Sequence, residues 1–177
     1  MDNSFVAWFL GAVVLSWAMG AYNRLVRLRA KGLLAFSDLE QILGQQMALI
    51  SANFLEDAMV IDDAPEDWHH LLASARAMSS ALKIAHTQPL NSVANSGLKD
   101  SIEAMGLYWR QLANLPPDLA GSFLPPSFQL QWEQLAFQVD RARAEFNQSV
   151  INYNEAKDQF PANLLAKIFG FKSAQPV

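Results

Sequence analysis

The sequence predicts an all-α protein: an antiparallel bundle of four main helices, the first and last of them long, preceded by an N-terminal transmembrane helix. Three observations lead to this prediction. Phe5 to Tyr22 contains no charged side chain. Downstream, apolar residues recur at alternating spacings of three and four, which is the period of one helical face. No sustained period-two alternation and no Asn-Gly or Asp-Gly turn indicates a strand or hairpin.

Composition limits the class of protein. A chain of 177 residues suits one domain and is long enough to bury a core. Only 17% of the residues are charged, against about 25% in soluble domains, and a membrane segment accounts for that deficit. The absence of cysteine excludes disulfides, thiolate metal sites and cysteine nucleophiles. A net charge of −4 argues against general nucleic-acid binding.

The apolar segment Phe5 to Tyr22 predicts an uncleaved membrane anchor within residues 1–23. As a helix it is about 27 Å long, close to a hydrocarbon core of about 30 Å. Trp17 and Tyr22 are the kind of aromatic residues that lie at membrane interfaces. The alternative is a signal peptide cleaved after Ala18-Met19-Gly20, which has small residues at the right spacing. Residues 1–4 lack a basic side chain, and this favours the anchor.

A cluster of basic residues, which we call the basic collar, follows the anchor. It consists of Arg24, Arg27, Arg29 and Lys31. An acidic body comes next, because the following basic residue is Arg76. Since cytoplasmic flanks carry the excess of Lys and Arg, the collar predicts a single-pass cell-membrane protein with its C-terminal domain in the cytoplasm.

Small residues form a stripe within the anchor at Ala12, Ser16 and Gly20. Their i, i+4, i+8 spacing lets two membrane helices approach closely, so the stripe is a candidate surface for homo-oligomers. The alternative is that small residues are simply common in such helices.

The first two helices of the bundle follow from periodicity and end signals. The first continues out of the membrane without a break and ends in the acidic run around Asp62-Asp63. Its apolar face consists of Phe36, Leu39, Leu43, Met47, Ile50 and Phe54. The second begins at Pro65, where Asp63 and Glu66 have capping-box spacing, and ends at Gln88-Pro89. Its apolar face consists of Trp68, Leu71, Leu72, Ala75, Met78, Leu82 and Ala85.

The remaining helices are predicted in the same way. The third, which Pro116-Pro117 ends, carries Leu98, Ile102, Met105, Trp109 and Leu112. The long fourth helix carries Phe128, Trp132, Leu135, Val139, Ala142, Phe146, Val150 and Tyr153. Pro161 closes it or opens a last short helix, and Gly170 ends that helix, with Phe171 packing back on the preceding turn.

The last third of the chain holds aromatic-Asn pairs one heptad apart, Phe146-Asn147 and Tyr153-Asn154. A partly buried Asn must find a partner, so Asn147 and Asn154 either fix helix register or contact a peptide or ligand. The segment Phe160–Phe171 is either a cap on the bundle end or a docking surface. Helix punctuation explains its Pro161 and Gly170, so we expect a cap in which Phe169 and Phe171 cover the bundle end.

These motifs resemble the LemA family at both ends of the chain, over about residues 5–43 and 124–171. The signature residues are Tyr22, Asn23, Phe146, Asn147, Tyr153, Asn154, Phe160, Pro161, Asn163, Gly170 and Phe171. Where relatives carry an Arg-rich turn and Asp-Leu-Ile-Pro-Asn-Leu, residues 45–54 lack the Asp and the Pro. The resemblance implies a membrane-anchored helical bundle with no known catalytic residues.

Catalytic and metal-binding patterns are weak. His69 and His70 lie near Glu66, and Glu66 and His70 could share one ion, but a stable site needs three or more ligands. No Gly-x-Ser-x-Gly elbow, Walker glycine loop or dinucleotide glycine pattern is present. We therefore predict no catalytic residue, no cofactor and no metal.

Taken together, the sequence predicts a membrane anchor (residues 1–23), a LemA-like bundle (24–172) and a short tail (173–177). The predicted function is a non-enzymatic interaction or scaffold module with the bilayer and an unidentified protein as partners. One alternative is a metal-dependent enzyme or regulator that uses the His69/His70 acidic cluster. Another is a membrane-surface sensor whose collar binds anionic headgroups at about 1 kcal/mol per basic residue.

Overall fold

The computed structural model describes residues 3–54, 66–116 and 124–177. Across these residues it contains helices and no strand, so the predicted all-α class is confirmed. The helices are α1 (Asn3–Phe54), α2 (Glu66–Thr87), α3 (Ser92–Ala113), α4 (Pro126–Asp158) and α5 (Ala162–Phe169).

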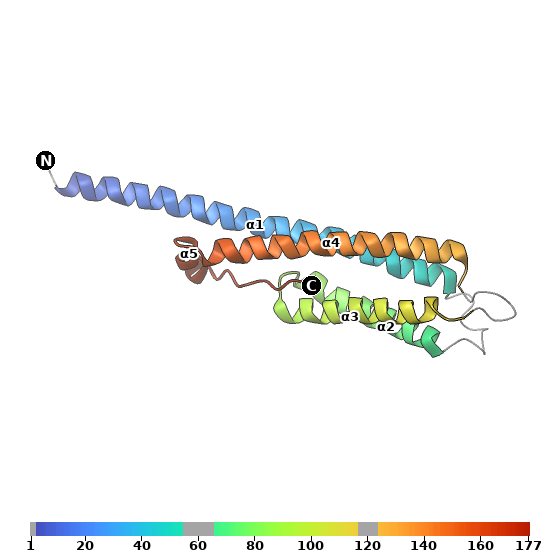
Figure 1. Ribbon diagram of the computed structural model, residues 1–177. Helices are drawn as coiled ribbons and strands as arrows, with labels where there is room; N and C mark the ends of the chain where they lie inside the picture. Colours follow the sequence, from blue (N-terminus) through green and yellow to red (C-terminus); the bar gives the residue numbers. More distant parts are fainter. Residues whose placement is uncertain (1–2, 55–65, 117–123) are drawn as a thin grey trace.

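The helices form two antiparallel pairs that pack on each other (Figure 1). The long helices α1 and α4 make one pair, and the shorter α2 and α3 make the other. The N-terminal part of α1 projects beyond the bundle, and α5 lies beside α1 where this projection begins (Figure 1). The bundle is thus built on the C-terminal half of its own first helix.

Helix α1 is unbroken from the predicted membrane segment into the bundle, as expected. Its bundle half buries Phe36, Leu39 and Leu43 at 2%, 0% and 0% exposure, because these residues share one helical face. The predicted helix end in the acidic run and the capping box at Asp63 lie outside the described residues.

Helix α3 begins and ends at asparagines. The side chain of Asn91 accepts hydrogen bonds from the backbone N–H groups of Val93 (2.9 Å) and Ala94 (3.2 Å), which satisfies donors that the first helical turn cannot pair internally. Asn114 is the C-cap. All five apolar residues predicted to face the core from this helix are buried.

Helix α4 buries its predicted apolar stripe except for Leu135, which is half-buried. After a short break, Pro161 is the N-cap of α5, so the proline opens a last short helix. Gly170 ends α5 in the left-handed conformation with φ of 70°, and the N–H of Phe171 donates to the carbonyl of Ala166 (2.9 Å). The predicted C-terminal glycine is confirmed.

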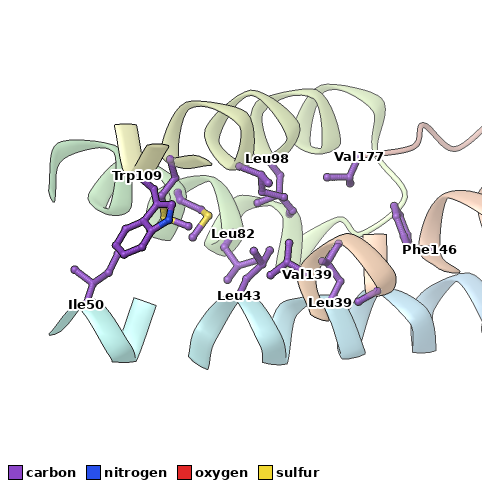
Figure 2. Packing of buried hydrophobic residues seen from close by; sticks show 14 of the residues in the cluster. Leu39, Leu43, Ile50, Leu82, Leu98, Trp109, Val139, Phe146 and Val177 are labelled. Atoms are coloured by element: carbon purple, nitrogen blue, oxygen red, sulfur yellow. The ribbon is translucent and has the colours of Figure 1, made fainter. Parts of the chain in front are cut away.

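The core draws side chains from both helix pairs (Figure 2). The rings of Phe36 on α1 and Phe146 on α4 meet edge-to-face at 5.6 Å, and Trp109 on α3 stacks on Trp132 of α4 at 4.4 Å. A smaller cluster of Leu25, Ala156 and Ala162 joins α1, α4 and α5. Each aromatic pair contributes about 0.5–1.5 kcal/mol beyond its buried area.

Residues 171–177, which we call the C-terminal strap, run back between the two helix pairs and end beside α3 (Figure 1). Ala174 is 6% exposed and Val177 is 1% exposed, and both belong to the core. Figure 2 shows Val177 among the side chains of Leu98 and Phe146. The residues that the sequence set apart as a short tail therefore pack as part of the bundle.

Candidate functional site

The asparagines of the two aromatic-Asn pairs hold the backbone of the C-terminal strap. Asn154 Nδ2 donates to the carbonyl of Ala174 (2.8 Å), and Asn154 Oδ1 accepts from the N–H of Ala174 (3.0 Å). Asn147 repeats this arrangement on Val177, with distances of 2.9 Å and 2.8 Å. Each amide thus pairs with both polar backbone groups of one strap residue.

Three more side chains bind the strap. Arg143 Nε donates to the backbone oxygen of Val177 (2.7 Å), Asn95 Nδ2 donates to the carbonyl of Gln175 (2.7 Å), and the Tyr153 hydroxyl donates to the carbonyl of Lys172 (2.9 Å). Every one of these contacts is to a backbone atom. The side chains that the strap buries are small, Ala174 and Val177. The groove therefore binds an extended backbone with little selectivity for the side chains of the bound segment.

The spacing of the two asparagines explains the register of the strap. Seven residues of helix rise about 10.5 Å. Three residues of a fully extended chain span about 10 Å. Asn154 pairs with Ala174 and Asn147 pairs with Val177, so a heptad of α4 matches a step of three strap residues that run antiparallel to it. The strap is consequently close to full extension.

Burial also changes the chemistry of Tyr153. The side chain lies in the core at 3% exposure, and loss of hydration raises the pKa of its hydroxyl above the ordinary value of 10.0, although the nearby positive charge of Arg29 opposes this. The neutral hydroxyl therefore persists as the donor to the strap carbonyl over the whole physiological range.

A cleft of about 550 Å³ between α3 and α4 continues the line of the strap. Arg143 joins the two, because it binds Val177 and also lines the cleft. The cleft runs along α4 from Arg143 toward Trp132, away from the two asparagines. Its lining residues are Gln46, Ile102, Glu103, Met105, Gly106, Trp109, Arg110, Trp132, Glu133, Ala136, Val139, Asp140 and Arg143.

Gln46 is the unusual member of this lining. It is 3% exposed, and its Oε1 atom is buried with no hydrogen-bond partner among the described residues. A buried acceptor without a donor costs about 1–3 kcal/mol. A donor that reached Oε1 would remove that cost.

The residues of the basic collar are exposed on α1 and point to two sides. Arg24, Arg27 and Lys31 line a hollow with α4, where Arg24 approaches Gln159 Oε1 at 3.5 Å. Arg29 lines a separate hollow next to Tyr153 and the start of the strap. The stripe of Ala12, Ser16 and Gly20 is exposed on the projecting part of α1.

Aromatic rings join α5 to α1 at the base of the projection. Trp17 contacts Phe160 at 5.1 Å, and Tyr22 contacts Phe169 at 5.0 Å and Phe171 at 5.9 Å. Phe171 is half-buried, but Phe169 is 58% exposed, so the expectation that Phe169 covers the bundle end is not met. The reason is that α5 packs through the small residues Ala162 and Ala166 and leaves Leu164, Ile168 and Phe169 exposed.

The remaining signature residues lie at the surface. Asn23 and Asn163 are exposed, and Phe160 is 72% exposed. In the signature, therefore, only Phe146 and Tyr153 are core aromatics, while Asn147 and Asn154 bind the strap.

The histidine cluster is open to solvent. His70 Nε2 lies 3.7 Å from Glu66 Oε1, whose side chain is 90% exposed, and the His70 ring stacks on Tyr108 at 5.2 Å. His86 pairs instead with Glu40 on α1 at 2.8 Å. No three His, Asp or Glu side chains come together as a metal site in the parts of the chain that the structure describes. Asp63 lies outside those parts.

Sequence reasoning missed the strap, Asn95 and Gln46. The strap has no periodicity, and its recognition is through backbone atoms, which leave no trace in side-chain pattern. The available signal was the heptad spacing of Asn147 and Asn154, for which a peptide contact was one of two interpretations.

The model of the LemA family matches residues 70–177, which include α3, α4, α5 and the strap. The resemblance predicted for residues 5–43 lies outside the matched range. Searches of curated proteins and of solved structures gave no match.

Proposed function

Because the protein belongs to the LemA family, which is not a known enzyme family, we propose that it is a membrane-anchored, non-enzymatic helical bundle that serves as a protein-interaction or scaffold module. The observation that carries the proposal is the continuity of α1 (Asn3–Phe54). One continuous helix contains both an exposed apolar segment and buried residues of the bundle core such as Phe36, Leu39 and Leu43.

The exposed segment supports anchoring. Among the described residues, α1 is the one helix long and apolar enough to cross a membrane. Trp8, Leu10 and Leu15 are 81%, 57% and 72% exposed, and a soluble protein would leave such a continuous apolar surface in water at high cost. Insertion in a bilayer removes that cost. The basic collar follows directly and supports a cytoplasmic bundle.

Helix α5 and the preceding Phe160 supply more apolar surface beside the end of the apolar segment of α1. Phe160, Leu164, Ile168 and Phe169 are 72%, 55%, 68% and 58% exposed. Their neighbours on α1 are Trp17 and Tyr22, the aromatic residues at the end of the apolar segment. A short helix held there would place its large side chains in the headgroup boundary, where amphipathic helices bind.

The lack of cysteine permits a direct test. Leu10→Cys, Ile168→Cys and Phe137→Cys would each carry one environment-sensitive fluorophore, in full-length protein reconstituted in nanodiscs with nitroxide-labelled lipids. We expect strong quenching at residue 10 by deep nitroxides and at residue 168 by shallow ones. Phe137, 72% exposed on α4, is the control and should show none. Absence of quenching at residue 10 would refute the anchor.

The same variants test orientation and partnership. A membrane-impermeant maleimide should label residue 137 only after cells are permeabilised; labelling in intact cells would place the bundle outside. Native-source co-purification should recover a protein partner, and a monomer that turns over a defined substrate would refute the non-enzymatic part.

A further inference from the structure

The cleft between α3 and α4 adjoins the groove that holds the strap, and Arg143 lies at both. We propose that the cleft binds an extended peptide segment of a partner protein, in line with residues 171–177. This inference rests on the proposed interaction function and specifies the chemistry of the partner.

Continuity with the strap is the first argument. The strap shows that the space between the helix pairs accommodates an extended backbone. Asparagine and arginine side chains form hydrogen bonds with the polar groups of that backbone. Beyond Val177 the same walls continue as the open cleft. From Arg143 to Trp132, α4 rises about 16 Å. That length accommodates about five residues of extended chain.

The unpaired oxygen of Gln46 is the second, independent argument. Its side chain is 3% exposed and lines the cleft, and Oε1 has no partner among the described residues. Oε1 is itself enclosed, so the Gln46 side chain must turn toward the cleft before a backbone N–H of a bound peptide can supply the missing donor. The pairing would then match that of the Ala174 and Val177 N–H groups with the side-chain oxygens of Asn154 and Asn147. The cleft thus repeats the recognition seen in the strap.

The lining decides which side chains fit. Trp109, Trp132 and Val139 form an apolar floor, which suits a small or medium apolar side chain that faces inward. On the rim, Arg143 is already paired with Glu103 at 3.1 Å. The other rim charges are Glu133, Asp140 and Arg110, which leaves a negative balance. The partner segment is therefore extended, apolar on the buried side and basic on the exposed side.

The test uses full-length protein in nanodiscs and a phage-displayed library of random twelve-residue peptides as the probe. Two variants address the cleft. Gln46→Leu removes the unpaired acceptor while preserving volume, and should melt at an equal or higher temperature because no partner is lost. Ala136→Trp fills the cleft from α4, where Ala136 is part of the lining. Phe137→Ala, on the neighbouring exposed residue, is the matched control.

We expect selected peptides to carry basic residues and to lose about tenfold in affinity on Gln46→Leu, the loss of about one hydrogen bond. Ala136→Trp should abolish binding, and Phe137→Ala should leave it unchanged. No selected binder, or binders indifferent to both cleft variants, would overturn the proposal. A dimer that forms without peptide and dissociates on Ala136→Trp would also overturn it, because the occupant would be a second copy.

The outcome is separable from that of the anchoring test. Quenching at residue 10 without any peptide binder would support the anchored bundle and refute only peptide binding in the cleft. A peptide binder without quenching at residue 10 would refute the membrane anchor and support peptide binding in the cleft.

Discussion

Removing one asparagine of the strap groove should release the strap without unfolding the bundle. In Asn154→Ala, two hydrogen bonds to the backbone of Ala174 are lost, at 2.8 Å and 3.0 Å. A net contribution of about 1 kcal/mol for each bond gives about 2 kcal/mol. The free energy of local strap opening should fall by that amount, which corresponds to exchange of the strap amides about 30-fold faster.

Hydrogen–deuterium exchange of the full-length protein, read on peptides that cover residues 171–177, measures this directly. Asn154→Asp should give a smaller increase of about fivefold, because it keeps an acceptor for the Ala174 N–H and loses only the donor to the Ala174 carbonyl. Asn152→Ala is the control, since that exposed residue on the same helix accepts from Gln148 and, among the described residues, makes no hydrogen bond to the strap. Its strap amides should exchange as in the wild type.

Two results would refute the reasoning. Unchanged strap exchange in Asn154→Ala would mean that the amide pairing contributes nothing. Equal acceleration of amide exchange across α4 and the strap would mean that Asn154 stabilises the whole bundle. The strap would then not open independently of the helices.

Three further predictions concern α4, α5 and the glycine that ends α5. Phe146→Ala should lower the free energy of unfolding by about 3–5 kcal/mol because its ring is fully buried, whereas Phe169→Ala, at an exposed ring, should cost far less; chemical denaturation in detergent compares them. Tyr153 has a raised pKa, so the stability that this residue contributes should be fully present below pH 10 and be lost as the pH rises through the folded-state pKa, and Tyr153→Phe should remove that loss in pH-dependent melts. Gly170→Ala should cost about 1–2 kcal/mol in thermal stability through backbone strain alone, because φ is 70° and no atom lies within 4 Å of the added methyl group; an unchanged melting temperature would contradict this.

The helices could be predicted because burial and periodicity coincide in them. On α3, Leu98, Ile102 and Met105 stand at helical spacing and are all buried. Pro161 and Gly170 likewise act through local backbone preferences, which a sequence shows directly. Interactions between residues within about one helical turn were sufficient to predict these helix ends and buried faces.

The strap and Phe169 could not be predicted for the opposite reason. Ala174 and Val177 are held through backbone atoms of a segment without regular structure, so their burial depends on α4 and α3 already being in place. Phe169 looks like a core residue by type, but α5 rests on the smaller Ala162 and Ala166, and rotation of that short helix decides which face is covered. Both outcomes are set by tertiary packing.

The aromatic-Asn pairs serve two interfaces because neighbouring residues on a helix point about 100° apart. Phe146 faces the core, where it meets Phe36, and Asn147 faces the strap. Tyr153 places its ring in the core, and Asn154 binds Ala174. The heptad spacing keeps the two aromatic residues on one core stripe. The same spacing separates the two asparagines by the length of three extended strap residues. Core packing and recognition of an extended backbone are consequently built by a single sequence repeat, and substitution of either asparagine should release the strap while the aromatic core stays assembled.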